Sequence, residues 1–133
     1  MNALDDKQVD EKSFSWRDLL GLDRWDSFTV VASLTVVGTP TYVGRYRFVG
    51  KKCEFQISAV ASTSIASTAG THYFQSPTAA KGISGQATMT NATTKIAVGN
   101  CHIDNSVSPA RIYLPTQAAS GNTFHVAGWY EIG

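Results

Sequence analysis

The sequence predicts an all-β protein, a jelly-roll-like antiparallel β-sandwich that follows a short N-terminal extension containing a helical turn. From Phe28 onward, apolar and polar residues alternate with a period of two, which places successive side chains on opposite faces of a strand. Glycine, proline and asparagine interrupt this alternation at short intervals. About eight short strands separated by such turns are typical of a sandwich.

The first strand is expected over residues 28–37, and a Gly-Thr-Pro break at residues 38–40 ends it. A hairpin follows, with a turn at Gly50, Lys51 and Lys52. The positions expected on the core face of the hairpin are Tyr42, Gly44, Tyr46, Phe48, Cys53, Phe55, Ile57 and Ala59. We therefore expect Tyr46 and Phe48 to be buried. Arg45 and Arg47 should face outward or across a subunit contact.

The rest of the body is expected to continue as short strands. Residues 61–70 form a loop of small residues, and Pro77 and Pro115 each end a strand. The strands are expected at residues 71–76, 86–90, 94–103, 110–114 and 123–132. Asp104 and Asn105 begin a loop in which such side chains bond their own backbone.

The N-terminal extension, residues 1–27, differs from the β-sandwich domain, residues 28–133. Residues 1–28 hold seven acids against four bases, a net charge of −3, whereas residues 29–133 carry a net +4. Ser15 and Asp18 have the form of a capped helix start. The large apolar residues of the extension are Trp16, Leu19, Leu20, Leu22 and Trp25. Such a segment either folds back on the β body as a lid or docks into another protein.

Composition narrows the classes of function. The basic residues are spread along the chain and form no dense stripe, which disfavours nucleic-acid binding. No apolar run is long enough to insert into a membrane, and no secretory signal is recognisable. Cys53 and Cys101 are isolated, so we expect reduced, partly buried thiols and assembly in a cytosol.

Residues 25–133 resemble the small β-sandwich domains of tailed-bacteriophage tail-fibre and virion-surface proteins. The resemblance lies in the Gly-Arg-Tyr-x-x-Val-Gly-Lys hairpin at residues 44–51, the aromatic-x-x-Pro segment at residues 74–77 with Tyr73 before it, and the Gly-aromatic closing strand at residues 126–132. It implies a homotrimer on a virion that binds cell-surface glycans or other virion proteins. The chain has no shaft or coiled-coil region, which indicates a small separate subunit, at either the head or the tail.

Enzymatic function is not expected. A glycosidase needs two carboxylates flanking the bond, and Glu54 and Glu131 alternate with core residues on strands. No Gly-x-Ser-x-Gly elbow occurs, and neighbouring Cys101 and His102 point to opposite faces of one strand. His72, His102 and His125 share no metal-binding spacing. No cofactor or metal site is predicted, although a trimer axis would bring together three copies of one histidine.

The prediction is thus a non-enzymatic phage virion protein, assembled in the host cytoplasm. Exposed aromatic and amide side chains are candidate glycan contacts, and those chosen are Tyr73, Gln75, Asn105 and Tyr113. The valines expected opposite the core face are Val31, Val37, Val43 and Val49, which favours a homotrimer through the β body. The extension is expected to attach the trimer to other virion proteins. The alternatives are a free-standing carbohydrate-binding module and, less favoured, a small polysaccharide hydrolase.

Overall fold

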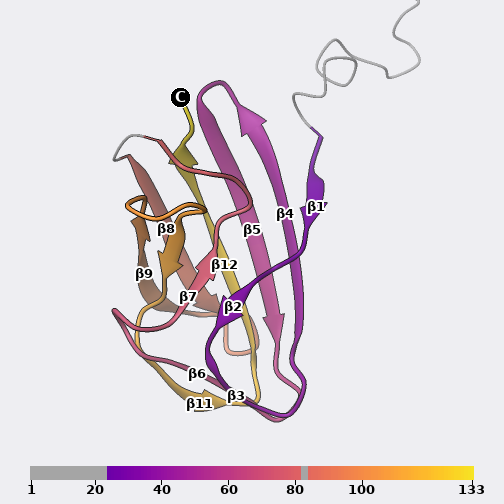
Figure 1. Ribbon diagram of the computed structural model, residues 1–133. Helices are drawn as coiled ribbons and strands as arrows, with labels where there is room; N and C mark the ends of the chain where they lie inside the picture. The colour runs from indigo at the N-terminus through magenta and orange to yellow at the C-terminus, as the bar shows by residue number, and fades with distance from the viewer. Residues whose placement is uncertain (1–23, 82–83) are drawn as a thin grey trace, which may run out of the picture.

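The computed structural model describes residues 24–81 and 84–133, and within these ranges the chain forms twelve β-strands and no helix (Figure 1). The first six strands are β1 (Asp26–Phe28), β2 (Ala32–Ser33), β3 (Thr35–Val37), β4 (Thr41–Val49), β5 (Lys52–Val60) and β6 (Ser64–Ser67). The others are β7 (Tyr73–Gln75), β8 (Gly85–Asn91), β9 (Ile96–Asp104), β10 (Arg111–Tyr113), β11 (Gln117–Ser120) and β12 (Thr123–Glu131). All their pairings are antiparallel, which confirms the all-β class.

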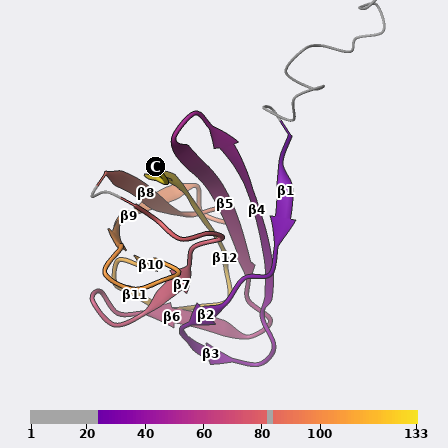
Figure 2. The same ribbon diagram turned by 45° about the horizontal axis from the view of Figure 1, so that its top comes forward.

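Nine of these strands form one curled sheet in the order β1-β4-β5-β12-β8-β9-β10-β7-β2. Strands β4, β5 and β12 lie on one side of the curl and β9, β10 and β7 on the other (Figures 1 and 2). A second sheet, β11-β6-β3, closes the lower end in the view of Figure 1. Strands β1 and β2 lie at the two edges of the large sheet, so residues 29–31 between them cross its opening.

The core fills the space inside the curl and draws on both of its sides. Every second residue of β5 is buried, as the alternation predicts. The largest fully buried side chains are Tyr130, Phe55, Phe74, Phe124, Ile57, Ile65, Met89, Ile112, Leu114, Val126 and Cys53. The ring of Tyr42 on β4 meets that of Phe74 on β7 edge-on, with centroids 5.9 Å apart. This contact joins the two sides of the curl directly.

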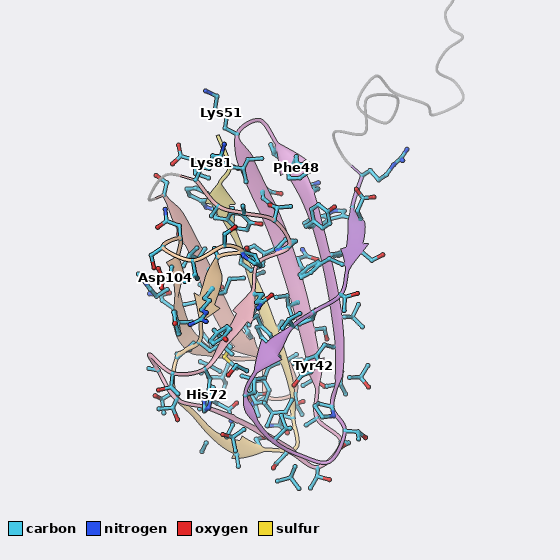
Figure 3. All side chains as sticks on the ribbon, in the orientation of Figure 1. Tyr42, Phe48, Lys51, His72, Lys81 and Asp104 are labelled. Atoms are coloured by element: carbon cyan, nitrogen blue, oxygen red, sulfur yellow. The ribbon has the colours of Figure 1, made fainter. Side chains whose placement is uncertain are left out.

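The predicted hairpin is confirmed, with two corrections: Tyr46, expected to be buried, is only half-buried, and Phe48 near the tip is exposed. Strands β4 and β5 pair from Thr41 opposite Val60 to Val49 opposite Lys52. Gly50 opens the two-residue turn with a φ of +60°, a conformation that glycine adopts without steric cost. The predicted burial of Phe48 is wrong, because 43% of its surface is exposed. Phe48 lies on the core side but near the tip of the hairpin, where less of the molecule covers it (Figure 3).

The single strand expected over residues 28–37 is instead three short strands, β1, β2 and β3, because this segment moves from one sheet edge to the other and then into the small sheet. Its alternation holds through Leu34 and fails at Val36, which is 38% exposed. Gly44 is buried beneath this crossing, and a Cβ there would lie 2.6 Å from the ring of Phe28. The loop expected over residues 61–70 contains β6, which pairs with both β3 and β11.

The helical turn expected near Ser15 lies outside the described residues, as does most of the N-terminal extension. In the part of the chain that the structure describes, no helix has the length and apolar character needed to cross a bilayer.

Candidate functional site

Three strands present a polar and aromatic face on the side opposite the core. On β10, Ile112 is buried among the core residues, so Arg111 and Tyr113 on either side of it point outward. The register places Tyr113 directly between Tyr73 and His102, and Arg111 directly between Gln75 and Asp104. With Asn100, two residues before His102, these side chains define the β7–β10–β9 face: Tyr73, Gln75, Asn100, His102, Asp104, Arg111 and Tyr113.

The aromatic row runs across all three strands of this face. The rings of Tyr73 and Tyr113 meet edge-on, with centroids 5.5 Å apart and an interplanar angle of 65°. The His102 ring lies 6.5 Å from that of Tyr113 and is inclined to it by 26°. The two tyrosines are half-buried and His102 is exposed. The row therefore offers ring surface to a ligand while packing holds the tyrosine side chains in place.

Arg111 lies between the two tyrosines. Its guanidinium carbon is 4.4 Å from the centroid of the Tyr73 ring, a cation–π contact. Its Nη1 donates a hydrogen bond of 3.2 Å to the Tyr113 hydroxyl, and this bond is the main cause of the raised pKa of Arg111. Two contacts thus fix the position of a permanently charged, half-exposed group.

Asp104 lies opposite Arg111 but is engaged by its own loop. Its Oδ1 accepts hydrogen bonds from the Ser106 backbone N–H at 2.9 Å and from the Ser106 hydroxyl at 2.6 Å. These bonds favour the ionised carboxylate and lower the pKa of Asp104. The predicted turn at Asp104 and Asn105, in which the side chain bonds its own backbone, is therefore confirmed at Asp104.

An open hollow of about 440 Å³ adjoins the aromatic row, comparable in size to ligand sites of about 300–1,000 Å³. Its lining residues are Ala69, Gly70, Asn100, His102, Tyr113, Leu114, Pro115 and Thr116. The Ser67 hydroxyl donates to the Pro115 carbonyl at 2.6 Å, and the Ala69 N–H donates to the Thr116 hydroxyl at 2.9 Å. These bonds hold the loop after β6 against the segment after β10, so both walls of the hollow are fixed.

The structure brings together three of the four predicted glycan contacts: Tyr73, Gln75 and Tyr113. Asn105 is exposed in the loop after β9, one residue beyond Asp104. Arg111 was missed, although it stands two residues before Tyr113 and the strand period puts both on one face. The sequence alone does not show that Arg111 lies beside Tyr73. The two residues become neighbours because β7 and β10, which are far apart in the sequence, pair in the sheet.

Of the predicted docking residues, only Trp25 is described, and Trp16, Leu19, Leu20 and Leu22 lie outside the described residues. The Trp25 ring packs on the outer side of β4, opposite the core. The guanidinium carbons of Arg45 and Arg47 lie 4.9 Å and 4.6 Å from its centroid. As predicted, both arginines point away from the core, and Arg47 Nε also donates to Glu54 Oε1 at 2.7 Å. Trp25 is thus held on the β body.

The three histidines lie on different elements: His72 directly precedes β7, His102 lies on β9 and His125 lies on β12. In residues 24–81 and 84–133, no three His, Cys, Asp or Glu side chains cluster as a metal would require. His72 Nδ1 accepts a hydrogen bond of 2.8 Å from the Thr68 N–H. Cys53 and Cys101 are unbridged, as predicted, and burial raises the pKa of the Cys101 thiol to about 12. Burial and a high pKa make that thiol a weak nucleophile at neutral pH.

Comparison of this chain with protein-family models, with curated proteins and with solved structures finds no match.

Proposed function

We propose that this protein is a non-enzymatic structural subunit of a phage virion that binds host cell-surface glycans through its β7–β10–β9 face. In this proposal the body is a jelly-roll-like sandwich that forms a homotrimer. The N-terminal extension attaches the trimer to other virion proteins, at the head or the tail. The virion assignment rests on the sequence resemblance.

The observation that carries the binding role is the convergence of Tyr73, Gln75 and Tyr113 on one outward face. Sugars present apolar C–H faces, which pack against aromatic rings, and hydroxyl groups, which need hydrogen-bond partners fixed in direction. The tyrosines supply ring surface, and the amides of Gln75 and Asn100 supply both donors and acceptors.

The trimer is supported by exposed valines, two of which, Val43 and Val49, lie on the outer face of β4. The exposed fractions of Val31, Val37, Val43 and Val49 are 48%, 54%, 59% and 42%. Val43 lies in a row with Ser58 and His125 across β4, β5 and β12, and it borders a hollow on this outer side of the sheet. Large exposed apolar side chains on a strand face favour burial against another subunit.

The binding role is tested on an array of bacterial surface oligosaccharides. The full-length protein is expected to bind a subset of the array, and Tyr73→Ala with Tyr113→Ala to abolish that binding. The matched control is Phe48→Ala, which also removes a partly exposed aromatic ring but lies at the hairpin tip. Binding that survives the tyrosine substitutions would contradict the proposal.

A free-standing carbohydrate-binding module would use the same face, so oligomeric state separates the two functions. Light scattering on the purified protein is expected to give the mass of a trimer, whereas a glycan-binding monomer would favour the module. A hydrolase is disfavoured because Glu54 pairs with Arg47 and Asp104 bonds Ser106. Both carboxylates are therefore already engaged by neighbouring side chains.

A further inference from the structure

Arg111 is held rigidly but has no carboxylate partner in residues 24–81 and 84–133. The single ion pair that these residues form joins Arg47 to Glu54, on the other side of the curled sheet. Arg111 donates to the Tyr113 hydroxyl from Nη1 only, so its remaining N–H donors are available on a half-exposed face. A guanidinium fixed in this way is preorganised to form paired hydrogen bonds with an incoming carboxylate.

The carboxylate nearest in the register, Asp104, does not neutralise Arg111 by contact. Both hydrogen bonds to its Oδ1 come from Ser106, which directs this carboxylate into its own loop. Asp104 is ionised at neutral pH, as an ordinary aspartate is, and the Ser106 bonds lower its pKa further. Asp104 therefore weakens the positive potential at Arg111 without occupying its donors.

The surroundings of Arg111 favour a sugar over a simple anion. The Tyr73 and Tyr113 rings flank the guanidinium, and the hollow beside Tyr113 is lined by Asn100 and His102. Ring surface contributes little to the binding of a free inorganic ion, whereas ring surface and amide groups together match a pyranose with its hydroxyls. A carboxylated pyranose has all the groups that this face can bind.

We infer that the β7–β10–β9 face binds an acidic saccharide, with Arg111 as the partner of its carboxylate and the Tyr113 ring and Asn100 as contacts of its pyranose. This inference rests on the proposed function, because it names the ligand class of the same site. The carboxylate belongs to a uronic acid or to a sialic acid, and the two sugars present it at different ring positions. Tyr113 also positions Arg111 through its hydroxyl.

The inference is tested by nuclear magnetic resonance titration of the ¹⁵N-labelled full-length protein. The probes are methyl β-D-glucuronide, the methyl glycoside of N-acetylneuraminic acid, and methyl β-D-glucoside. The glucuronide and the glucoside differ only in a carboxylate against a hydroxymethyl group. At least one acidic probe is expected to shift the amide signals of β9 and β10, with a dissociation constant about tenfold below that of the glucoside. The preferred acidic probe identifies the carboxylate position.

Two variants of the face test the role of Arg111. Arg111→Gln is expected to remove the preference for the acidic probe, so that the acidic and neutral probes bind with equal affinity. Asp104→Asn keeps an oxygen for the Ser106 bonds but removes the negative charge, so it is expected to strengthen acidic-probe binding. The charge-matched control is Lys51→Gln, in the exposed β4–β5 turn (Figure 3), which should leave all three affinities unchanged.

Three results would overturn the inference. The first is equal affinity for the acidic and neutral probes. The second is a preference for the acidic probe that survives Arg111→Gln. The third is weaker binding of the acidic probe by Asp104→Asn than by the unchanged protein. Unperturbed amide signals away from β9 and β10 verify that each variant is folded.

A neutral sugar that shifts the amide signals of this face as strongly as an acidic sugar overturns the inference alone. If glycans that bind on the array shift no amide signal of the β7–β10–β9 face, the proposed function is overturned as well.

Discussion

At the scale of single residues, position along a strand decides burial as much as the face on which a residue lies. Phe48 and Phe55 both point to the core side of the β4–β5 hairpin. Phe55 lies mid-strand, is 1% exposed and packs its ring against Tyr130 at 5.9 Å. Phe48 lies near the turn and keeps 43% of its surface exposed. Alternation predicts the direction of both side chains but not where the opposite layer ends.

Truncating the two phenylalanines should therefore have unequal effects. Phe55→Ala is expected to lower the free energy of unfolding by about 3–5 kcal/mol, as for an emptied core site. Phe48→Ala should cost about 1 kcal/mol, because it buries only part of its ring. Urea denaturation of the two variants measures the difference. Equal losses would show that the hairpin tip is covered, for example by another subunit.

At the scale of elements, the last strand fixes the loop that follows β7. The Tyr130 hydroxyl accepts a hydrogen bond from the Thr78 N–H at 3.0 Å and donates to the Thr78 carbonyl at 3.1 Å. Burial raises the pKa of Tyr130 above its ordinary value of 10.0. The loop begins directly after Gln75, so this bond also restrains one edge of the β7–β10–β9 face.

Tyr130→Phe should destabilise the protein and change its response to alkali. Loss of the hydroxyl leaves the Thr78 N–H unsatisfied, at a cost of about 1–2 kcal/mol at neutral pH. The folded state holds the phenol proton more tightly than the unfolded state. The resulting stabilisation is complete below pH 10 and is lost as pH rises further. Denaturation between pH 7 and 11 should show a smaller alkaline loss in the variant, and parallel curves would contradict the assignment.

Elements defined by local patterns could be predicted, and those that depend on distant partners could not. The hairpin at residues 41–60 and the closing strand carry unbroken alternation, and both appear close to the expected bounds. Apart from the buried Ile65, strands β6 and β11 consist of small and polar residues, so the local pattern does not identify them and only long-range pairing with each other and with β3 makes them strands. The site divides in the same way. Tyr73, Gln75 and Tyr113 were identifiable by residue type, but their meeting with Arg111 and His102 depends on long-range register.

At the scale of the whole molecule, the proposed binding face and the proposed trimer contact lie on different sides of the curled sheet. Strands β7, β10 and β9 lie on one side of the curl and β4, β5 and β12 on the other (Figures 1 and 2). Val43 and the hollow that it borders lie on the outer side of the second group. A trimer that buries the second side would leave the first free. Three copies of a weak site would then act together, which raises the avidity for a surface carrying many glycans.

Val43→Glu tests this arrangement. A charge buried in a subunit contact is unfavourable, so the variant is expected to be monomeric at micromolar concentration while keeping its fold. Light scattering reports the mass, and circular dichroism reports the β structure. Val107→Glu is the matched control, because Val107 is 37% exposed in the loop after β9. A folded trimer of Val43→Glu would exclude this face from the contact.

Deleting residues 1–24 tests the role of the extension. The deletion keeps Trp25, whose ring contacts Arg45 and Arg47, and is expected to leave a folded trimer that no longer joins the particle. Mass spectrometry of purified particles gives the amount incorporated. Full incorporation of the truncated chain would refute attachment through the extension, and failure to fold would identify the extension as a lid on the core.

The most direct test of the central claim is a crystal structure of the protein with the tightest-binding oligosaccharide of the array. We predict that a sugar ring lies against Tyr73 or Tyr113 and that a hydroxyl or carboxylate bonds Arg111. A ligand seated instead in the outer hollow, lined by Val43, Ser58 and His125 among others, would contradict the assignment of the β7–β10–β9 face.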